Sequence, residues 1–288
     1  MKIVSLVPSA TEMVASLGLV HRLVGVTHSC DHPPEVADLP RVTSTSVPVD
    51  ASGREIDRAV RDSVAAGDPL YRIDLPLVRR LAPDLMVTQG VCDVCAVGEA
   101  QATACLAALD EPPVVVSMHP HRFEDVLEDL MRLGRATGVE DRARELVSEL
   151  RRRIETVRRR VGDQAPVDVV VLEWVDPLFS AGHWTPDLVD LAGGRELLAV
   201  PGERSRELAW DEVRAADPQV LVLACCGRDE ARTRVDLDRL RDLPGYDELR
   251  AVRGGRVHIF DGGAHFSRPG PRLVESVERL AGALHRLE

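Results

Sequence analysis

Several cysteine and histidine side chains in this sequence have spacings that suit metal binding. Cys92 and Cys95 form a C-x-x-C pair, the spacing that lets two thiolates bind one metal ion. His28 and Cys30 offer two further ligands from a neighbouring strand end, and Cys226 could approach from the second half of the chain. Three thiolates, with or without an imidazole, suit tetrahedral zinc or an iron–sulfur cluster. The sequence therefore predicts a Cys/His metal site that holds one of these cofactors.

The same cysteines have two other interpretations. A C-x-x-C pair at a strand-to-helix turn can carry out thiol–disulfide exchange, and a free thiol is often simply buried. Cys105 lies in an alanine-rich helical stretch and is predicted to be a core residue. Cys225 and Cys226 follow an apolar strand, so we expect one of them in the core and the other facing a cleft.

No motif of a known catalytic class accompanies these residues. The sequence has no G-x-S-x-G elbow, P-loop or H-E-x-x-H pair, and Gly262-Gly263 is not a dinucleotide fingerprint. An enzyme would have to use the cysteine cluster itself, through a metal-activated water or a thiolate nucleophile. The sequence leaves enzymatic activity open and favours a binding protein.

Composition and charge argue against nucleic-acid-binding and membrane-inserted classes. The 288 residues carry a net charge of −11, and acids are interspersed among the arginines of residues 151–160, which indicates a solvated helix face. No window approaches the roughly 20 apolar residues that a membrane helix needs. The apolar stretch before Pro8 is too short for the core of a signal peptide, so we expect a cytoplasmic protein.

Strand and helix patterns alternate along the first half of the chain. Apolar runs predict strands, and helical spacings predict helices between them. The strands are expected at residues 3–7, 23–27, 85–88 and 114–117, and the helices at 9–18, 54–66, 75–81, 99–109 and 122–137. Ser9 and Glu12 have the spacing of a capping box. The alternation predicts an α/β fold with a mainly parallel sheet.

The same alternation restarts in the second half. Residues 140–161 form a charged, glycine-free helical pattern, and about 22 residues at 1.5 Å each span roughly 33 Å, enough to connect two lobes. Strands at 167–174 and 257–260 and a helix at 273–287 follow. The predicted domains are an N-terminal lobe (1–138), a connecting helix (139–162) and a C-terminal lobe (163–288).

A weak internal repeat indicates that the two lobes have related topology. Residues 81–87 and 216–222 both run from a helix end through a proline into a buried strand, and cysteines follow both strands within a few residues. Ligands of open α/β sheets bind beyond the carboxyl ends of the strands. Both groups of cysteines are therefore expected at such an edge.

These segments together resemble the helical-backbone (class III) substrate-binding proteins of ABC importers, closest to the vitamin B12 (cobalamin)-binding family. The resemblance covers nearly the whole chain and rests on residues 5–12 (SLVPSATE), 24–27 (VGVT) with Asp31 and Pro33, 82–85 (APDL) and 267–272 (SRPGPR), in this order. It implies two lobes joined by one long helix, with an aromatic-lined cleft between them for a large planar ligand. Members carry an export leader or a lipid-anchor cysteine, so an ABC permease is an expected partner only if this chain is exported.

The few aromatic side chains fit that implication. The chain has 3 Trp, 2 Tyr and 4 Phe, and Trp174, Trp184 and Phe266 fall in predicted loops of the second lobe, where indole faces would suit a corrin or core positions would suit them equally. His183 and His265 lie in the same loops and could supply an imidazole to a metal. The predicted function is a binding protein that holds a corrinoid or related metal-containing ligand on these five residues. The alternative is a cytoplasmic metalloprotein or metalloenzyme with a Cys-rich site.

Overall fold

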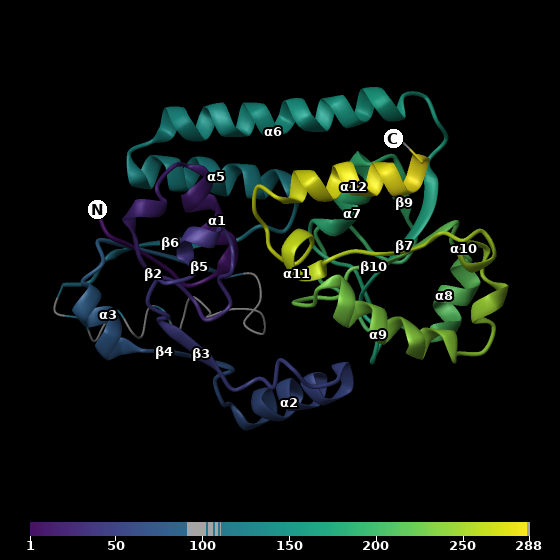
Figure 1. Ribbon diagram of the computed structural model, residues 1–288, viewed down its shortest axis with the longest axis horizontal. Helices are drawn as coiled ribbons and strands as arrows, with labels where there is room; N and C mark the ends of the chain where they lie inside the picture. Colours follow the sequence, from purple (N-terminus) through teal and green to yellow (C-terminus); the bar gives the residue numbers. More distant parts are fainter. Residues whose placement is uncertain (91–101, 103–105, 107–108, 110, 287–288) are drawn as a thin grey trace. The chain divides into compact units, whose positions relative to one another are not determined.

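The computed structural model describes residues 1–90, 102, 106, 109 and 111–286 (Figure 1). By their internal contacts, the residues divide into two units. Unit 1 comprises Met1–Pro120 and Glu124–Ser148, and unit 2 comprises His121–Phe123 and Glu149–Glu288. Among the described helices, none has both the length and the apolar character needed to cross a membrane.

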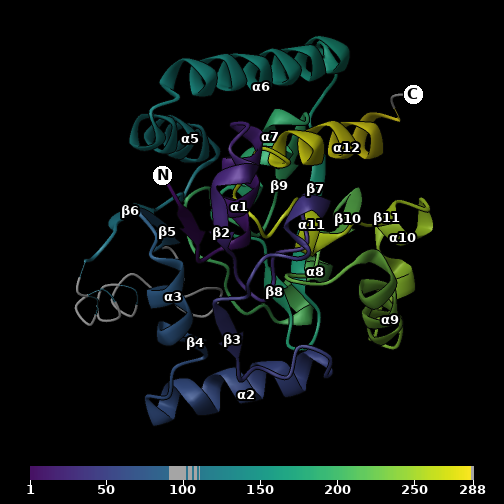
Figure 2. The ribbon, with the colours of Figure 1, turned by 60° about the vertical axis from the view of Figure 1, so that its left-hand side comes forward.

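Unit 1 is built on a parallel sheet of four strands in the order β2-β1-β5-β6. The strands are β1 (Ile3–Ser5), β2 (Leu23–Gly25), β5 (Leu85–Gln89) and β6 (Val114–Met118). Around them lie α1 (Pro8–Ser16), α3 (Leu75–Leu81), α5 (Phe123–Thr137) and the 3-10 turns η1 (Val20–Arg22) and η2 (Pro34–Val36). Figures 1 and 2 show α1 and α5 on one face of the sheet and α3 on the other. The predicted parallel α/β arrangement is confirmed.

The start of α1 differs from the prediction. Pro8 is its first residue, and Val7 stands at the N-cap without a side-chain hydrogen bond, so the expected capping box at Ser9 and Glu12 is wrong. Proline suits this position because its missing N–H has no partner in the first turn of a helix. Ser9 is buried instead and donates its hydroxyl to Gln89 Oε1 at 3.5 Å. The helix predicted at residues 99–109 lies largely outside the described residues.

The segment of unit 1 between η2 and α3 extends away from the four-stranded sheet. It consists of an antiparallel hairpin, β3 (Thr43–Thr45) with β4 (Tyr71–Ile73), that carries helix α2 (Gly53–Ala66) at its tip. A parallel bridge joins Val26 to Arg41, so β3 continues beyond the carboxyl end of β2. In both Figure 1 and Figure 2, α2 lies at the far end of this hairpin from the four-stranded sheet.

Helix α6 spans Glu140–Val161, the same residues as the sequence predicts. Its first turn is acidic and its last turn contains three arginines, which complements the helix dipole at both ends. The division between the two units falls inside this helix, after Ser148. The boundaries at 138 and 162 stay a prediction.

Unit 2 is built on five strands. The order is β11-β10-β7-β8, with β9 also paired to β7, and every pair is parallel except β7 with β8. The strands are β7 (Val167–Trp174), β8 (Phe179–Ser180), β9 (Gly194–Glu196), β10 (Val220–Leu223) and β11 (Val257–Ile259). The helical segments are α7 (Thr185–Leu191), α8 (Trp210–Ala216), α9 (Glu230–Arg241), η3 (Tyr246–Glu248), α10 (Arg250–Arg253), α11 (Gly262–His265) and α12 (Leu273–His285).

Alternate side chains of β7 and β10 enter two different cores. Leu172 and Leu223 belong to a cluster with residues of α8, α9 and α10. On the opposite face Gly194 lets α7 and α12 approach the sheet, since an added Cβ would lie 2.7 Å from Val189 Cγ1 and 2.8 Å from Leu284 Cδ1. The apolar runs that predicted strands are therefore buried on both faces, as parallel sheets require.

The predicted internal repeat is visible in the backbone. Ala82 and Asp217, at equivalent places after α3 and α8, both have left-handed conformations with φ of 45° and 40°. Two residues later Asp84 and Gln219 accept backbone N–H groups from Lys2 and Asp168, at 2.6 and 2.9 Å. Both contacts tie the central strand of a unit to its neighbour at the amino edge of the sheet.

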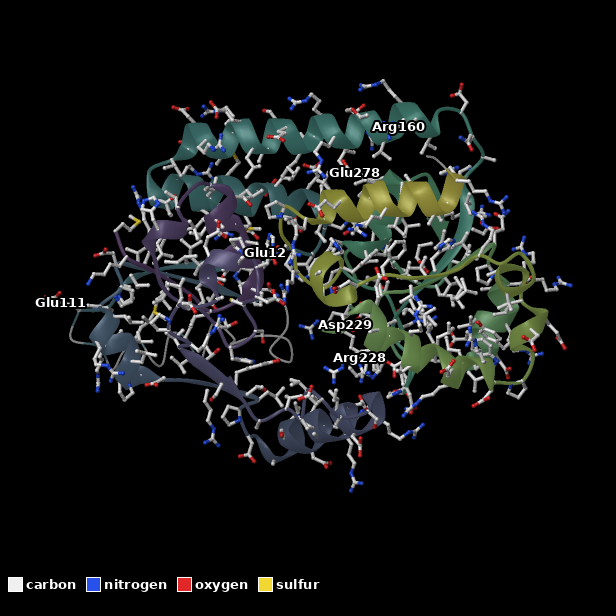
Figure 3. The ribbon with its side chains drawn as sticks, viewed as in Figure 1. Glu12, Glu111, Arg160, Arg228, Asp229 and Glu278 are labelled. Carbon is white, nitrogen blue, oxygen red and sulfur yellow. The ribbon has the colours of Figure 1, made fainter. Side chains whose placement is uncertain are left out.

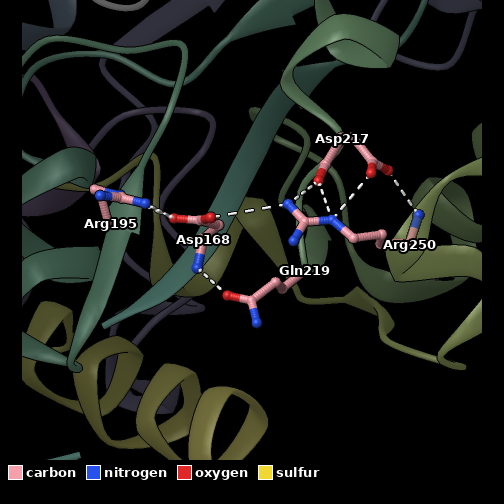
Figure 4. A network of polar contacts seen from close by, with 5 residues as sticks. All are labelled: Asp168, Arg195, Asp217, Gln219 and Arg250. Carbon is pink, nitrogen blue, oxygen red and sulfur yellow. Dashed lines mark hydrogen bonds and ion pairs between the residues drawn. The ribbon is translucent and has the colours of Figure 1, made fainter. Parts of the chain in front are cut away.

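In unit 2 a larger network of charged side chains surrounds this edge. Figure 4 shows that Asp168 accepts two hydrogen bonds from Arg195, at 2.6 and 2.8 Å, and lies 3.8 Å from Arg250. Arg250 forms a second ion pair with Asp217 at 3.0 Å. The network links the starts of β7, β9 and β10 to α10.

Candidate functional site

The carboxyl edge of the unit 2 sheet is formed by two tightly packed segments. The turn that follows β10 (residues 224–228) lies against the start of α11, where a Cβ on Gly262 would be 2.1 Å from Cys225 O. Only glycine permits this approach of two backbones. The Gly-Gly pair of the sequence thus has a packing role, and it fixes the position of the residues that follow the turn.

Trp174 and Arg228 form the most distinctive contact at this edge. Trp174 ends β7, and the Arg228 guanidinium lies 5.0 Å from the centre of its ring, a cation–π geometry. Arg228 stands directly before Asp229 and α9 (Figure 3). Its guanidinium is held by an ion pair with Asp236 of α9 at 2.9 Å, and both side chains are only 8% exposed. One aromatic face is therefore combined with a fixed positive charge.

A second ion pair supports the Trp174 loop. Asp176 pairs with Arg239 of α9, and its carbonyl oxygen accepts the Trp174 Nε1–H at 3.1 Å. Burial raises the pKa of Asp236, against the effect of the Arg228 and Arg239 guanidiniums, which lower it. The carboxylates and guanidiniums of α9 and the β7–β8 loop therefore hold Trp174 in place.

His183 lies on the loop between β8 and α7 in an unusual environment. Its φ of 51° is left-handed, and its Nε2 is buried without a hydrogen-bond partner. Burial, the His121 ring 5.8 Å away and Arg204 together lower the pKa of His183 to about 4. The imidazole is thus neutral at physiological pH, and its Nε2 is buried without a hydrogen bond. Left-handed non-glycine residues concentrate at functional sites.

Three of the predicted ligand contacts, Trp184, His265 and Phe266, have little exposed surface. Trp184 and Phe266 are 6% and 4% exposed, and the Trp184 Nε1–H donates to Phe266 O at 2.8 Å. His265 Nδ1 is buried without a hydrogen bond, and Glu275 Oε2 lies 3.8 Å away. Burial lowers the pKa of His265, so this contact joins a carboxylate to a neutral ring and is not an ion pair. These geometries favour packing, and the predicted ligand contacts stay a prediction.

The carboxyl edge of the unit 1 sheet holds a buried hydroxyl and thiol cluster. Cys30 is 2% exposed, and its sulfur lies 3.1 Å from Thr11 Oγ1 and 3.3 Å from Thr27 Oγ1. Thr11 also donates to Ser5 Oγ at 2.8 Å. His28 Nδ1 contacts Thr43 Oγ1 at 2.8 Å, and its ring stacks on Tyr71. Hydroxyl groups are thus the polar neighbours of the Cys30 thiol among the described residues.

The predicted cysteine metal site gains no support from the part of the chain that is described. Cys92, Cys95 and Cys105 lie outside the described residues, and within them no group of three His, Cys, Asp or Glu side chains could hold a metal ion. Cys225 is fully buried, and burial raises the pKa of its thiol to about 12. Cys226 is partly exposed. The expected core position of one member of this pair is confirmed, and the expectation that the other faces a cleft stays a prediction.

The sequence analysis missed the Arg228–Asp236 pair. The sequence did contain an indication of it: Asp236 lies on the buried face of α9, together with Thr233, Leu237 and Leu240. A carboxylate at such a position needs a buried cation as partner. Which arginine supplies that cation depends on the packing of α9 against the turn after β10.

Comparisons with known proteins agree on the class of the chain. The family model described as Periplasmic binding protein matches residues 3–262. The uncharacterized ABC transporter substrate-binding lipoprotein YvrC of Bacillus subtilis (strain 168) is 24% identical over 293 residues, which cover 99% of this chain and 80% of YvrC. The vitamin B12-binding protein of Vibrio cholerae serotype O1 is 20% identical over 281 residues, which cover 97% and 87%.

Two solved structures show the same fold. Periplasmic vitamin B12 binding protein BtuF of Vibrio cholerae matches with a TM-score of 0.71 and 20% identity over 99% of this chain and 96% of BtuF. The apo form of periplasmic heme-binding protein RhuT from Roseiflexus sp. RS-1 matches with a TM-score of 0.71 and 21% identity over 99% and 98%. The predicted two-lobed α/β architecture and the resemblance to substrate-binding proteins of ABC transporters are confirmed.

Proposed function

We propose that this chain, which belongs to the Periplasmic binding protein family, binds a planar metal chelate of the tetrapyrrole class, with a corrinoid as the first candidate. Its relatives include proteins named for vitamin B12 binding and for heme binding. Both ligands are flat macrocycles that carry their own metal. The proposed contacts lie at the carboxyl edge of the unit 2 sheet, where ligands of parallel α/β sheets bind.

The observation that carries the proposal is the neutral imidazole of His183, whose Nε2 has no hydrogen-bond partner. A metal already held by four macrocycle nitrogens needs only one or two further ligands, whereas a bare ion needs three or more from the protein. The described residues contain no such group of three. Because burial and nearby positive charges lower the pKa of His183 to about 4, its nitrogen stays unprotonated at neutral pH, as a metal ligand must.

Coordination requires the His183 ring to turn outward, since Nε2 is covered in this structure. Trp174 supplies a partly exposed aromatic surface at the same edge, and the buried Arg228–Asp236 pair holds it in place. An aromatic face suits a flat ligand.

Absorbance titration with aquocobalamin, and in parallel with hemin, tests the proposal. The upper ligand of aquocobalamin exchanges readily, so an imidazole that replaces it shifts the visible spectrum. We expect saturable binding of at least one of the two, with a spectrum typical of nitrogen coordination. His183→Ala should abolish the shift, and His21→Ala, on an exposed histidine of η1, should retain it.

Two results would overturn the proposal at different points. If the purified chain binds neither macrocycle, the ligand class is wrong. If it binds one of them and His183→Ala gives the same spectrum and affinity as the wild type, the ligand class stands and the role of His183 is wrong. The expected cytoplasmic location is a separate proposal, and cell fractionation with an antibody to the native protein tests it.

A further inference from the structure

Strand β11 forms an edge of the unit 2 sheet and pairs with β10 alone. The Phe260 N–H donates to Leu223 O at 2.9 Å, and Ile259 is the register partner of Leu223. In a parallel pair this pattern directs the backbone N–H and C=O groups of Val257 and Ile259 away from β10. On that outer side neither residue has a hydrogen bond to any described residue. The edge can therefore pair with one more strand.

A groove of about 550 Å³ lies beside this edge, between β11 and α9. Leu237 of α9 and Tyr246 of η3 are each 5% exposed and form its apolar floor. Val257 and Ile259 pack against the same core cluster. Figure 2 shows α9 and α10 next to β11. An extended peptide that adds to a sheet edge gains main-chain hydrogen bonds, and an adjoining pocket for its alternate side chains gives specificity.

The charge of the groove favours an acidic occupant. Arg234 and Arg241 are seven residues apart, about two turns, so they lie on the same flank of α9, and both line the groove. Arg234 is exposed and has no carboxylate partner within the part of the chain that the structure describes. Arg241 pairs with Asp238 at 2.8 Å, but both side chains are more than half exposed, so solvent weakens the pair. Asp247 is the one acid among the described residues that line the groove, which is therefore net positive in a chain whose net charge is −11.

We propose that the groove between β11 and α9 binds an extended acidic segment of a partner protein, which adds to the unit 2 sheet as a strand next to β11. Its backbone pairs with the outward N–H and C=O groups of Val257 and Ile259. Its acidic side chains on the face toward α9 meet Arg234 and Arg241, and their methylene groups pack on the apolar floor. Because β11 has three residues, the added strand makes few hydrogen bonds, and the charges select the partner.

The same charges disfavour a second copy of this chain as the occupant. When two copies of β11 pair antiparallel about a two-fold axis, the axis is perpendicular to the joined sheet, so the α9 helices of both copies lie on one face. Arg234 and Arg241 of one copy would then approach the same arginines of the other. Like charges across a contact are unfavourable, so a partner of opposite charge is expected.

Fluorescence anisotropy with labelled peptides of about ten residues tests the proposal. The probe is a peptide of alternating glutamate and valine, which favours an extended strand and carries its carboxylates on one face. Peptides with glutamine or lysine in place of glutamate are the charge controls. A peptide of alternating glutamate and proline keeps the charge but lacks half of the N–H groups, so it cannot pair as a strand. We expect saturable binding of the glutamate–valine peptide that weakens as salt rises, and binding about tenfold weaker or less for the other three.

A charge reversal on α9 locates the bound peptide. Arg234→Glu should weaken binding of the glutamate–valine peptide about tenfold or more, because it replaces an unpaired positive charge with a negative one. Arg80→Glu is the matched control, since it makes the same change in net charge at an exposed arginine of α3 in unit 1, and it should leave the affinity unchanged. Circular dichroism checks that both variants remain folded.

Four results would overturn the proposal. If the glutamate–valine peptide binds no better than the glutamine–valine peptide, the groove does not select acidic segments. If the glutamate–proline peptide binds as tightly, the attraction is electrostatic only and no strand is added. If Arg234→Glu leaves the affinity unchanged, the peptide binds elsewhere. If sedimentation velocity shows a dimer of the chain that the peptide dissociates, a second copy occupies the edge.

Discussion

Replacing Asp236 with alanine should destabilise unit 2 more than any surface substitution would. Asp236 and Arg228 face each other at 2.9 Å with 8% of each side chain exposed, so solvent screens the pair very little. Removing the carboxylate leaves the guanidinium buried without the charge that compensates its lost hydration. Breaking a buried ion pair by removing one partner typically costs about 3–5 kcal/mol in the free energy of unfolding.

The lower end of that range applies here. The Arg228 guanidinium also lies 5.0 Å from the Trp174 ring, and this contact survives the substitution. A cation–π contact with partial burial contributes about 1–2 kcal/mol. We therefore expect a loss of about 3 kcal/mol, which corresponds to a fall in melting temperature of roughly 6–12 °C for a unit of this size.

Urea unfolding followed by tryptophan fluorescence and by far-UV circular dichroism measures this loss. The informative control is the double variant Arg228→Met with Asp236→Leu, which replaces the pair by apolar side chains of similar volume. Such exchanges are often neutral, so the double variant should be more stable than Asp236→Ala alone. If Asp236→Ala costs less than about 1 kcal/mol, or if the double variant is the less stable of the two, the pair is not a compensated buried charge.

Two further outcomes follow from the geometry of unit 2. Gly262→Ala should lower the free energy of unfolding by about 2–3 kcal/mol, because the new Cβ would lie 2.1 Å from Cys225 O; Gly263→Ala, where the nearest atom is 3.3 Å away, should cost less in the same urea assay. The free energy of unfolding should also fall as the pH drops from about 6.5 to about 4. In this range the unfolded chain binds a proton on His183, whereas the folded chain, in which the pKa of His183 is about 4, does not. The loss is at most about 3 kcal/mol. His183→Asn, which tolerates the left-handed backbone, should remove that part of the pH dependence, and an unchanged pH profile would contradict the reasoning.

Apolar periodicity was sufficient to predict most helices and strands. Helix α6 and strand β7 have the predicted bounds, because long patterns bounded by glycine or proline leave little ambiguity. The hairpin strands β3 and β4 were not predicted, since three residues are too few to show a period of two. The start of α1 was misplaced because Pro8 begins the helix, and the sequence offered Ser9 as a better cap.

Much less of the site could be predicted, because spacing does not give direction. In the sequence Cys30 stands close to His28, another potential metal ligand, yet the turn after β2 directs its sulfur toward two threonine hydroxyls. Trp184 lies in a loop by sequence, but its indole is buried and its N–H is bound to Phe266 O. His183 was predicted as a ligand contact, which stays a prediction; its left-handed backbone and its covered Nε2 could not be predicted because they depend on contacts with distant residues.

The sheets of the two units have similar contacts at their amino edges and different contacts at their carboxyl edges. At the amino edge Ala82 and Asp217 have the same left-handed turn, and the residues after them bind the neighbouring strand in the same way. At the carboxyl edge unit 1 has the hydroxyl and thiol cluster around Cys30, whereas unit 2 has Trp174 beneath a buried guanidinium. Side-chain oxygens fix the first edge in both units, whereas the loops of the second edge differ between the units, as functional loops on a common scaffold do. Substitutions of partly exposed side chains at the carboxyl edge should therefore alter binding at little cost in stability, whereas Gly262 and the Arg228–Asp236 pair also hold the fold together.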